Sequence, residues 1–311
     1  MRGILAIVLT AVGVAALGAQ ATSPNMTARE KANLQHVRSW WLECLEGRNL
    51  DATPKYQADS YIQHNINFPT GRAGFVKIFG DRFKAAGGPI IPPPKEFRNP
   101  PVVQFAKGDF VVLVWEREGK DPADPSKTYK YNAYDMLRIE NGKVAEHWDY
   151  ALLAKGTPRG GAPDGIDYDK VKFDFSSQEK KNIEIATVEF KDILQYGHVE
   201  LADKVMAPTY IQHNPNVPTG RAAFVEFFSR IRKPEPLQAG WKNKPAMMFA
   251  SGPYVFVLVK RMEKDPNDPS QTYPAYWFDM VRIENGMIQE HWDSATKNAP
   301  PQNAAPAGRA H

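Results

Sequence analysis

The chain has 311 residues, a length that predicts two domains, each large enough to bury a hydrophobic core. Its 39 basic and 35 acidic residues give a formal charge of +4 and are spread along the sequence, without the dense basic stripe that nucleic-acid binding requires. The only cysteine, Cys44, excludes an intrachain disulfide. We therefore expect a globular protein that is stabilised by core packing and has no nucleic-acid partner.

The N-terminus has the pattern of a secretory signal peptide. The basic start Met1-Arg2-Gly3 precedes an apolar run over 4–17, and Ala19-Gln20-Ala21 has the small residues of a cleavage motif. The run is shorter than the roughly 20 residues of a membrane-spanning helix. We expect residues 1–21 to be removed, the mature protein to be secreted or periplasmic, and no stable membrane association after cleavage. An uncleaved N-terminal anchor is the alternative.

Most of the remaining chain is a tandem duplication. The sequence Tyr61-Ile62-Gln63-His64-Asn65 returns 149 residues later as Tyr210-Ile211-Gln212-His213-Asn214. The stretch 121–149 matches 265–293 at an offset of 144, with 18 of 29 positions identical. The change in offset falls where the first copy has the longer proline-rich loop, over 87–101. Fixed offsets over long segments indicate two copies of one structural unit.

Within each copy, helical periodicity comes first and strand periodicity follows. In the first copy, the apolar residues spaced for a helix are Leu34, Val37, Trp41, Cys44 and Leu45. A second helix is expected after Gly71, and strands are expected over 111–115, 133–139 and 144–149. The second copy repeats this order from residue 183. Helices followed by antiparallel strands predict an α+β fold with the helices on one face of a curved sheet.

The repeat also sets the expected domain boundaries. We place the first domain at 28–154 and the second at 177–297. Residues 155–176 are expected to form a linker, which is exposed over its glycine- and proline-containing part, 156–165. Residues 298–311 are proline-rich and are expected to form a disordered tail.

Three motifs carry a resemblance to a known family. Tyr-Ile-Gln-His-Asn before a Gly-Arg helix start, Asp-Met-x-Arg-Ile-Glu-Asn-Gly, and Glu-His-Trp-Asp occur in both copies. They resemble the SnoaL-like polyketide cyclase branch of the nuclear-transport-factor-2-like superfamily, over residues 30–153 and 179–295. The resemblance implies two tandem cone-shaped α+β barrel domains, each with helices closing a pocket over a mostly antiparallel sheet. Members often dimerise through the outer face of the sheet, which implies an intramolecular pseudo-dimer of the two domains.

The final hairpin decides which polar side chains meet. Strand alternation places His147 and Asp149 on one face. A three-residue turn over 140–142 pairs Asp135 with His147 on that face, whereas a two-residue Asn-Gly turn places Asp135 opposite Trp148. We expect the three-residue turn, which gathers Asp135, His147 and Asp149. The same argument gathers Asp279, His291 and Asp293 in the second copy.

Two carboxylates and an imidazole beside an apolar surface form a plausible proton-transfer set. Burial and a neighbouring like charge raise a carboxyl pKa toward neutrality, where the group exchanges protons readily. The resemblance implies that Asp149 and Asp293, on the last strand, act as general acid/base. The family usually has a histidine on the preceding strand, where this chain has Asp135 and Asp279. The candidate catalytic residues are therefore Asp135, His147, Asp149, Asp279, His291 and Asp293.

Further polar residues precede the second helix of each copy. We expect them to line the mouth of the cavity and to bind the substrate: Tyr61, His64, Asn65, Tyr210, His213 and Asn214. The alternative is structural, since such residues also fix loops and strand ends. A metal site of His64, His147 and Asp149 has suitable ligand types, but nothing in the sequence brings His64 close, and we expect neither a metal nor a cofactor.

The two copies differ at three consecutive positions on the strand before the hairpin. Asn132, Ala133 and Tyr134 of the first copy become Tyr276, Trp277 and Phe278 in the second. These larger side chains are expected to shrink the second cavity and to leave the first copy as the more open site.

These observations favour a secreted protein that binds a small, largely apolar carbonyl compound. The superfamily that the chain resembles includes cyclases, isomerases, hydrolases and non-catalytic members. The first hypothesis is cofactor-free acid/base catalysis of the cyclase or isomerase type. The alternative is a non-catalytic ligand-binding or assembly module with the same fold.

Overall fold

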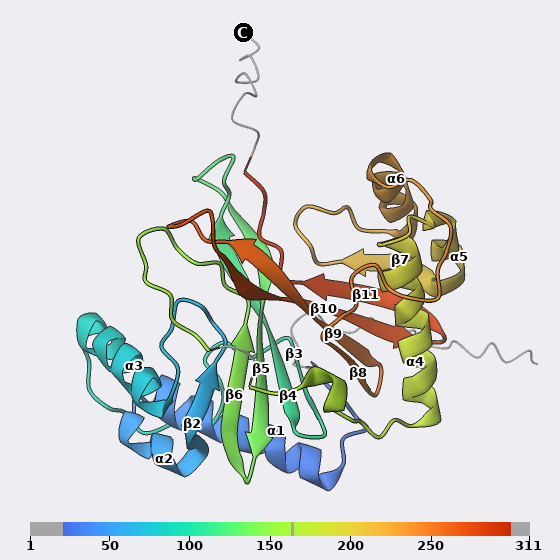
Figure 1. Ribbon diagram of the computed structural model, residues 1–311. Coiled ribbons are helices and arrows are strands. Elements are labelled where there is room, and N and C mark those ends of the chain that lie inside the picture. The colour runs from blue at the N-terminus through green and yellow to red at the C-terminus, as the bar shows by residue number, and fades with distance from the viewer. Residues whose placement is uncertain (1–20, 163–164, 300–311) are drawn as a thin grey trace, which may run out of the picture.

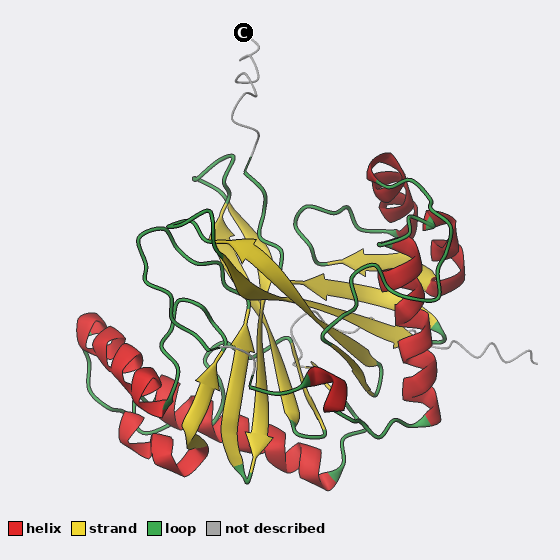
Figure 2. Ribbon diagram, in the orientation of Figure 1, coloured by secondary structure: helices red, strands yellow, loops and turns green. Residues whose placement is uncertain are grey.

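The computed structural model describes residues 21–162 and 165–299. The expected signal peptide, apart from Ala21, and residues 300–311 of the expected tail lie outside this range. Two sheets, each with helices on one face, form the molecule (Figures 1 and 2). Among the described residues, no helix combines the length and the apolar character that crossing a membrane requires.

The first unit follows the expected order of helices and then strands. Its elements are β1 (Ala21–Thr22), α1 (Ala28–Trp40), the π-helix η1 (Trp41–Glu46), η2 (Leu50–Ala52), α2 (Thr53–Tyr56), β2 (Gln57–Gln63), α3 (Arg72–Ala86), β3 (Val103–Lys107), β4 (Phe110–Lys120), β5 (Thr128–Glu140) and β6 (Lys143–Asp149). The sheet order is β1-β3-β4-β5-β6-β2, in which β2 runs parallel to β6 and β1 parallel to β3.

The second unit repeats this arrangement after a short 3-10 helix, η3 (Tyr168–Lys170). Its elements are α4 (Ser177–Thr187), the π-helix η4 (Val188–Ile193), η5 (Val199–Leu201), α5 (Ala202–Val205), β7 (Met206–Gln212), α6 (Arg221–Ile231), β8 (Met247–Ser251), β9 (Tyr254–Lys264), β10 (Thr272–Glu284) and β11 (Met287–Asp293). The sheet order is β7-β11-β10-β9-β8, and only β7 is parallel to its neighbour. The predicted fold class, two tandem α+β units with mostly antiparallel sheets, is confirmed.

The long helix of each unit begins at a capping box. Thr27 accepts a hydrogen bond from the backbone of Glu30, whose side chain accepts one from the backbone of Thr27, and Ser176 and Glu179 repeat this in α4. Helix α1 packs on β3 and β4, and its Trp40 is fully buried. Both helices continue into a π-helix, a geometry frequent at functional sites, where the chain passes over the concave face of the sheet.

The final hairpin closes with a two-residue turn, so the expected three-residue turn is wrong. Asn141 and Gly142 have φ values of 50° and 71°, as a type I′ turn requires, and Glu140 pairs with Lys143. A β-bulge then leaves Ala145 as an extra residue, so that Asp135 lies opposite Asp149 instead of His147. Without the bulge, Asp135 would lie opposite Trp148. The extra residue shifts the pairing by one, so Asp135, His147 and Asp149 all lie on one face. Gln289 is the extra residue of the same bulge in the second unit.

The outer faces of the two sheets pack against each other. Tyr134 of β5 stacks on Phe278 of β10, its equivalent in the other copy, with ring centroids 5.4 Å apart. Two other equivalent positions make reciprocal contacts: Asn132 donates a hydrogen bond to the carbonyl of His213, and Tyr276 contacts the ring of His64 edge-on. Contact between equivalent residues is the arrangement of a two-fold dimer, here within one chain.

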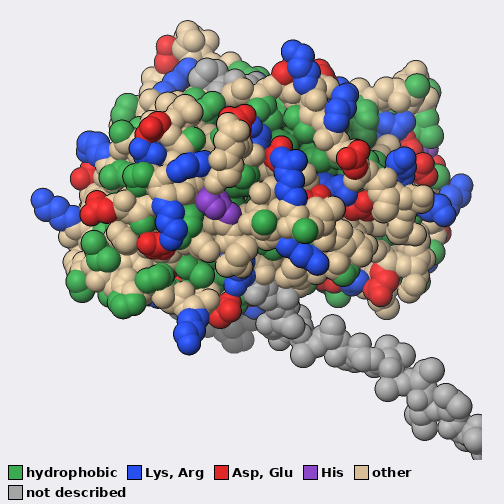
Figure 3. All heavy atoms as spheres, turned by 90° about the horizontal axis from the view of Figure 1, so that it is seen from below, with side chains coloured by type: hydrophobic (Ala, Val, Ile, Leu, Met, Phe, Trp, Pro, Cys, Tyr) green, Lys and Arg blue, Asp and Glu red, His purple; other side chains and the backbone are tan. Residues whose placement is uncertain are grey.

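The connection between the units packs against the first unit over part of its length. Gly160 donates a backbone hydrogen bond of 2.6 Å to the carbonyl of Ile66, and Ala162 donates one of 2.9 Å to that of Gln63. Further on, the Phe173 ring contacts both sheets through Phe110 and Phe249. Only parts of the segment expected to be exposed are therefore fully exposed. On the face seen in Figure 3, basic and acidic side chains are interspersed.

Candidate functional site

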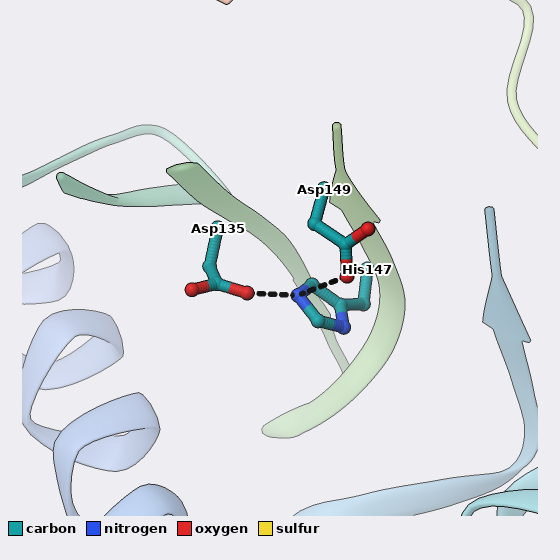
Figure 4. Close-up of side chains that lie close together, drawn as sticks. All are labelled: Asp135, His147 and Asp149. Atoms are coloured by element: carbon teal, nitrogen blue, oxygen red, sulfur yellow. Dashed lines mark hydrogen bonds and ion pairs between the residues drawn. The ribbon is translucent and has the colours of Figure 1, made fainter. Parts of the chain in front are cut away.

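The first polar cluster lies on the concave face of the first sheet (Figure 4). Its members are Asp135 from β5 and His147 and Asp149 from β6, and the bulge in β6 turns them to the same side. The His147 Nε2 atom lies 2.6 Å from Asp135 Oδ1 and 4.0 Å from Asp149 Oδ2. The Nε2 atom is therefore within hydrogen-bond distance of Asp135, whereas Asp149 lies beyond that distance, at the limit of an ion pair.

Donors from β2 face the other nitrogen of His147. The Tyr61 hydroxyl lies 3.0 Å and the Gln63 amide nitrogen 3.2 Å from Nδ1. The Gln63 oxygen accepts a hydrogen bond from the backbone of Asn65, which fixes the amide orientation. Because Gln63 also donates to the Tyr61 oxygen, the Tyr61 hydroxyl donates to Nδ1. Neutral His147 thus carries its proton on Nε2, toward Asp135.

A tryptophan covers Asp135. Trp115 Nε1 donates a hydrogen bond of 2.6 Å to Asp135 Oδ2, and the Trp41 ring packs on the Trp115 ring at 4.9 Å. The Arg117 guanidinium lies over the same ring. Both oxygens of Asp135 therefore have protein partners, one from His147 and one from Trp115.

The second cluster contains an additional carboxylate. His291 Nε2 lies 3.2 Å from Asp279 Oδ1, and His291 Nδ1 lies 2.9 Å from Oε1 of Glu189. Glu189 belongs to η4, is fully buried, and occupies the position of Trp40 in the first copy. Since both ring nitrogens face carboxylates, both must donate, and His291 is an imidazolium. The charges of Glu189 and Asp279 outweigh burial and raise the His291 pKa well above its ordinary value.

The aspartate on the last strand has a raised pKa in both copies. Burial is the main cause for Asp149, whose pKa rises to about 6 even though the charge of His147 opposes the shift. Burial likewise raises the pKa of Asp293, against the opposing charge of His291. An asparagine amide donates to each carboxylate: Asn65 to Asp149 at 2.5 Å and Asn214 to Asp293 at 2.6 Å. A carboxyl whose pKa is raised toward neutrality is suited to taking up and returning a proton.

A cavity of about 890 Å³ opens onto the second cluster. Its floor includes Asp279, His291 and Asp293 together with the amides of Gln212 and Asn214. Its walls include nine apolar side chains: Phe190, Leu194, Val217, Phe224, Phe228, Trp241, Val257, Val259 and Trp277. This volume lies within the range of small-molecule sites.

The expectation that three larger residues shrink the second cavity is wrong for two of them. Of the three enlarged residues, only Trp277 lines the cavity. Strand alternation turns Tyr276 and Phe278 to the outer face, where they contact the other unit. On the neighbouring strand, Val259 lines the cavity at the position that Trp115 occupies in the first copy.

Two of the expected substrate-binding residues lie on the opposite face of the sheet. His64 contacts Glu146 at 3.0 Å and stacks on Trp148, and His213 contacts Glu290 and Trp292 in the same way. The expectation that His64 and His213 line the cavity mouth is therefore wrong, and a metal site that includes His64 is excluded by its place. Tyr61, Asn65, Tyr210 and Asn214 lie on the concave side, in contact with the polar clusters or their hydrogen-bond partners.

Sequence reasoning missed Gln63 and Gln212, Trp115 and Glu189. An alignment of the two copies could have identified Trp115 and Glu189. Glu189 aligns with Trp40, and Trp115 aligns with Val259. In each triad the possible ligand atoms lie within 4.8 Å of one another. In both clusters, the imidazole Nε2 atom forms a hydrogen bond with a carboxylate. A bound cation would have to displace the shared proton of that hydrogen bond.

The comparison with family models decides the assignment. Residues 37–147 and 188–291 both match the model of the SnoaL-like domain. The chain belongs to the SnoaL-like family. No curated protein matches this SnoaL-like chain.

Similar solved structures each cover about two-fifths of the chain. An NTF2-like protein from Mesorhizobium loti is 18% identical, with a TM-score of 0.29, over 40% of this chain and 98% of its own. A LEH-like epoxide hydrolase from M. tuberculosis is 14% identical, with a TM-score of 0.28, over 37% of this chain and 83% of its own. A protein from Acidithiobacillus ferrooxidans described as a polyketide cyclase is 20% identical, with a TM-score of 0.28, over 38% and 89%.

Proposed function

We propose that this SnoaL-like protein binds a small, largely apolar carbonyl compound in the second unit and transfers a proton through Asp293. One observation carries the proposal: a buried carboxyl with a raised pKa lies at the floor of a cavity whose walls include nine apolar side chains. Membership in the SnoaL-like family supports a ligand-binding or cyclase-like function.

The arrangement suits proton abstraction next to a carbonyl group. The Asp293 carboxylate takes a proton from the α-carbon, the C–H electrons form the carbon–carbon double bond, and negative charge moves to the carbonyl oxygen. Asn214 holds the carboxylate. Polar donors of the cavity lining would stabilise the negative charge of the enolate as it forms. Return of the proton to another atom gives isomerisation, and attack of the enolate on a second carbonyl gives ring closure.

Deuterium exchange tests the proposal without knowledge of the natural substrate. Wild-type protein incubated in D2O with an apolar cyclic ketone, such as 2-tetralone, is expected to catalyse exchange of the α-hydrogens, followed by mass spectrometry. Asp293→Asn should slow the catalysed exchange by about 100-fold or more. Asp149→Asn is the matched control, since it changes the equivalent residue of the first unit. Exchange that survives in Asp293→Asn would exclude Asp293 as the base.

The first unit favours the second candidate function, that of a non-catalytic module. Trp115 occupies the space beside Asp135 and donates to its carboxylate, and the cluster is internally hydrogen-bonded. We propose that Asp135, His147 and Asp149 organise the strand end there. Asp149→Asn should then change the stability of the protein and leave the exchange reaction at its wild-type rate.

We also propose export of the protein with cleavage after Ala21. The support is the order of a basic start, a short apolar run and a small-residue motif in the first 21 residues. N-terminal sequencing of the protein recovered outside the cytoplasm is expected to begin at Thr22. A sequence beginning at Met1 would contradict removal of this segment.

A further inference from the structure

The exposed edge of the cavity is strongly basic. Seven of the residues that line the cavity are exposed, and five of these are Lys or Arg: Arg232, Lys242, Lys244, Lys260 and Arg261. The only carboxylates in the lining are Asp279 and Asp293, at the floor. An apolar cavity with an acidic floor and a basic edge can distinguish the two ends of a ligand.

The corresponding edge of the first copy is less basic, although Arg98 and Arg117 occupy the positions of Lys242 and Arg261. Gln195 and Met262, which line the cavity, correspond to Glu46 and Glu118, and Lys260 corresponds to Glu116. Three negative charges of one copy are therefore absent from the other, and one is replaced by a positive charge. Because the two units share a fold, this difference does not follow from the requirements of folding. It occurs in the copy that has the cavity.

Two guanidinium groups at the edge are available to a ligand. Arg261 lies over the ring of Trp277, a cavity-wall residue, at 4.1 Å. Arg232 follows the last residue of α6 and is exposed. In the part of the chain that the structure describes, no carboxylate pairs with Arg232 or Arg261. Lys242 and Lys244, in contrast, already pair with Glu235 and Asp169.

We infer that the ligand of the second unit carries an anionic group, such as a carboxylate, at the end opposite its reacting carbonyl. The inference rests on the proposed function, because it takes the same cavity as the binding site. The apolar body fills the cavity, the reacting end reaches Asp293, and the anionic end lies between Arg232 and Arg261. Guanidinium groups suit this role because they bind planar anions through two parallel hydrogen bonds.

A matched pair of fluorescent probes tests the inference. The anionic probe is 1-anilinonaphthalene-8-sulfonate, and the neutral probe is N-phenyl-1-naphthylamine, which has the same aromatic body without the sulfonate. Wild-type protein should bind the anionic probe about tenfold more tightly at low salt, as two partly exposed charge contacts allow. The preference should fall to about twofold near 1 M salt, where exposed charges are screened.

Substitutions separate the anionic group from the cavity itself. Arg232→Gln/Arg261→Gln should reduce the preference to about twofold, while the affinity for the neutral probe reports any loss of packing on Trp277. Lys180→Gln/Lys181→Gln removes the same charge from exposed positions of α4 and should keep the preference. Val259→Trp introduces the residue of the first copy and should weaken binding of both probes.

Two results would overturn the inference in different ways. The first is equal affinity for the two probes, or a preference that Arg232→Gln/Arg261→Gln leaves unchanged. This result would contradict the inference that the ligand carries an anionic group, and it would leave the proposed function standing. Binding of both probes that is unaffected by Val259→Trp shows that the cavity is not the binding site, and this overturns the inference together with the proposed site.

Discussion

One position separates the two imidazoles chemically. In the first copy, Trp40 fills the space beneath the π-helix, and His147 Nδ1 accepts from the Tyr61 hydroxyl. In the second, Glu189 takes the place of Trp40 and pairs with His291 Nδ1. The first imidazole can lose its proton and keep all its hydrogen bonds, whereas loss of the proton from His291 leaves one carboxylate without a donor.

Glu189→Gln is therefore expected to lower the pKa of His291 and to leave that of His147 unchanged, as measured by NMR titration. A histidine whose folded-state pKa is raised stabilises the protein below its ordinary pKa, 6.5, and loses this contribution as the pH rises through the folded-state value. The variant should thus be destabilised most at pH 6 and below, by about 3 kcal/mol. A deficit that does not change with pH would contradict the ion pair.

Asp149 gives a second prediction, in which a raised carboxyl pKa makes the protein less stable as the pH rises. Its pKa rises from 3.8 to about 6, because burial favours the neutral form. The resulting stability is present below pH 3.8 and is lost as the pH rises through 6. Since Asp149→Asn does not titrate, the wild type should lose about 1–3 kcal/mol relative to the variant between pH 4 and pH 7. Urea unfolding at several pH values measures this, and parallel pH profiles would show that Asp149 has an ordinary pKa.

The final hairpin shows how strands bring these residues together, and how far sequence reasoning reaches. Alternation predicted that His147 and Asp149 share a face, and the Asn-Gly pair predicted the hairpin. The predicted register was wrong because the residues of the turn do not indicate the bulge at Ala145. The bulge depends on how β6 pairs with both β5 and the parallel strand β2. The same reasoning misplaced His64, since the loop after β2 was not assigned to either face.

The turn itself provides a test by stability measurement. Gly142 has a φ of 71° and open space where a Cβ atom would lie, so Gly142→Ala should cost about 1 kcal/mol from backbone conformation alone. Gly80, within α3, also has room for a Cβ atom, and Gly80→Ala should stabilise the protein by about 0.5–1 kcal/mol. Chemical denaturation of both variants checks the opposite signs. A stabilising Gly142→Ala would rule out the left-handed turn.

The assembly of the two units rests on their outer sheet faces. One hydrophobic cluster contains buried residues of both units, including Phe105, Tyr134, Phe256 and Phe278. A buried ion pair joins Lys107 of the first unit to Glu179 of the second at 3.0 Å. The sequence alone predicted the duplication, but only the family resemblance predicted the contact between the outer faces. An apolar strand face does not determine which surface it packs against.

Removal of one ring from this contact should separate the unfolding of the units. Phe278→Ala is expected to cost about 3–5 kcal/mol, since it empties space between two sheets. Calorimetry should show one transition for the wild type and two for the variant. Phe75→Ala, within the first unit and buried there, is the matched control and should lower stability without resolving a second transition. A single transition in Phe278→Ala would show that the units unfold together without this contact.

The contact between equivalent residues has a consequence for divergence. In a homodimer, one gene encodes both partners, so every substitution appears in both binding sites. Here each unit has its own codons. Trp115 can fill the concave face of the first unit while Val259 lines an open cavity in the second, and the surface shared by the two units stays intact. Fusion thus allows one half to serve as a fixed scaffold while the other is free to specialise.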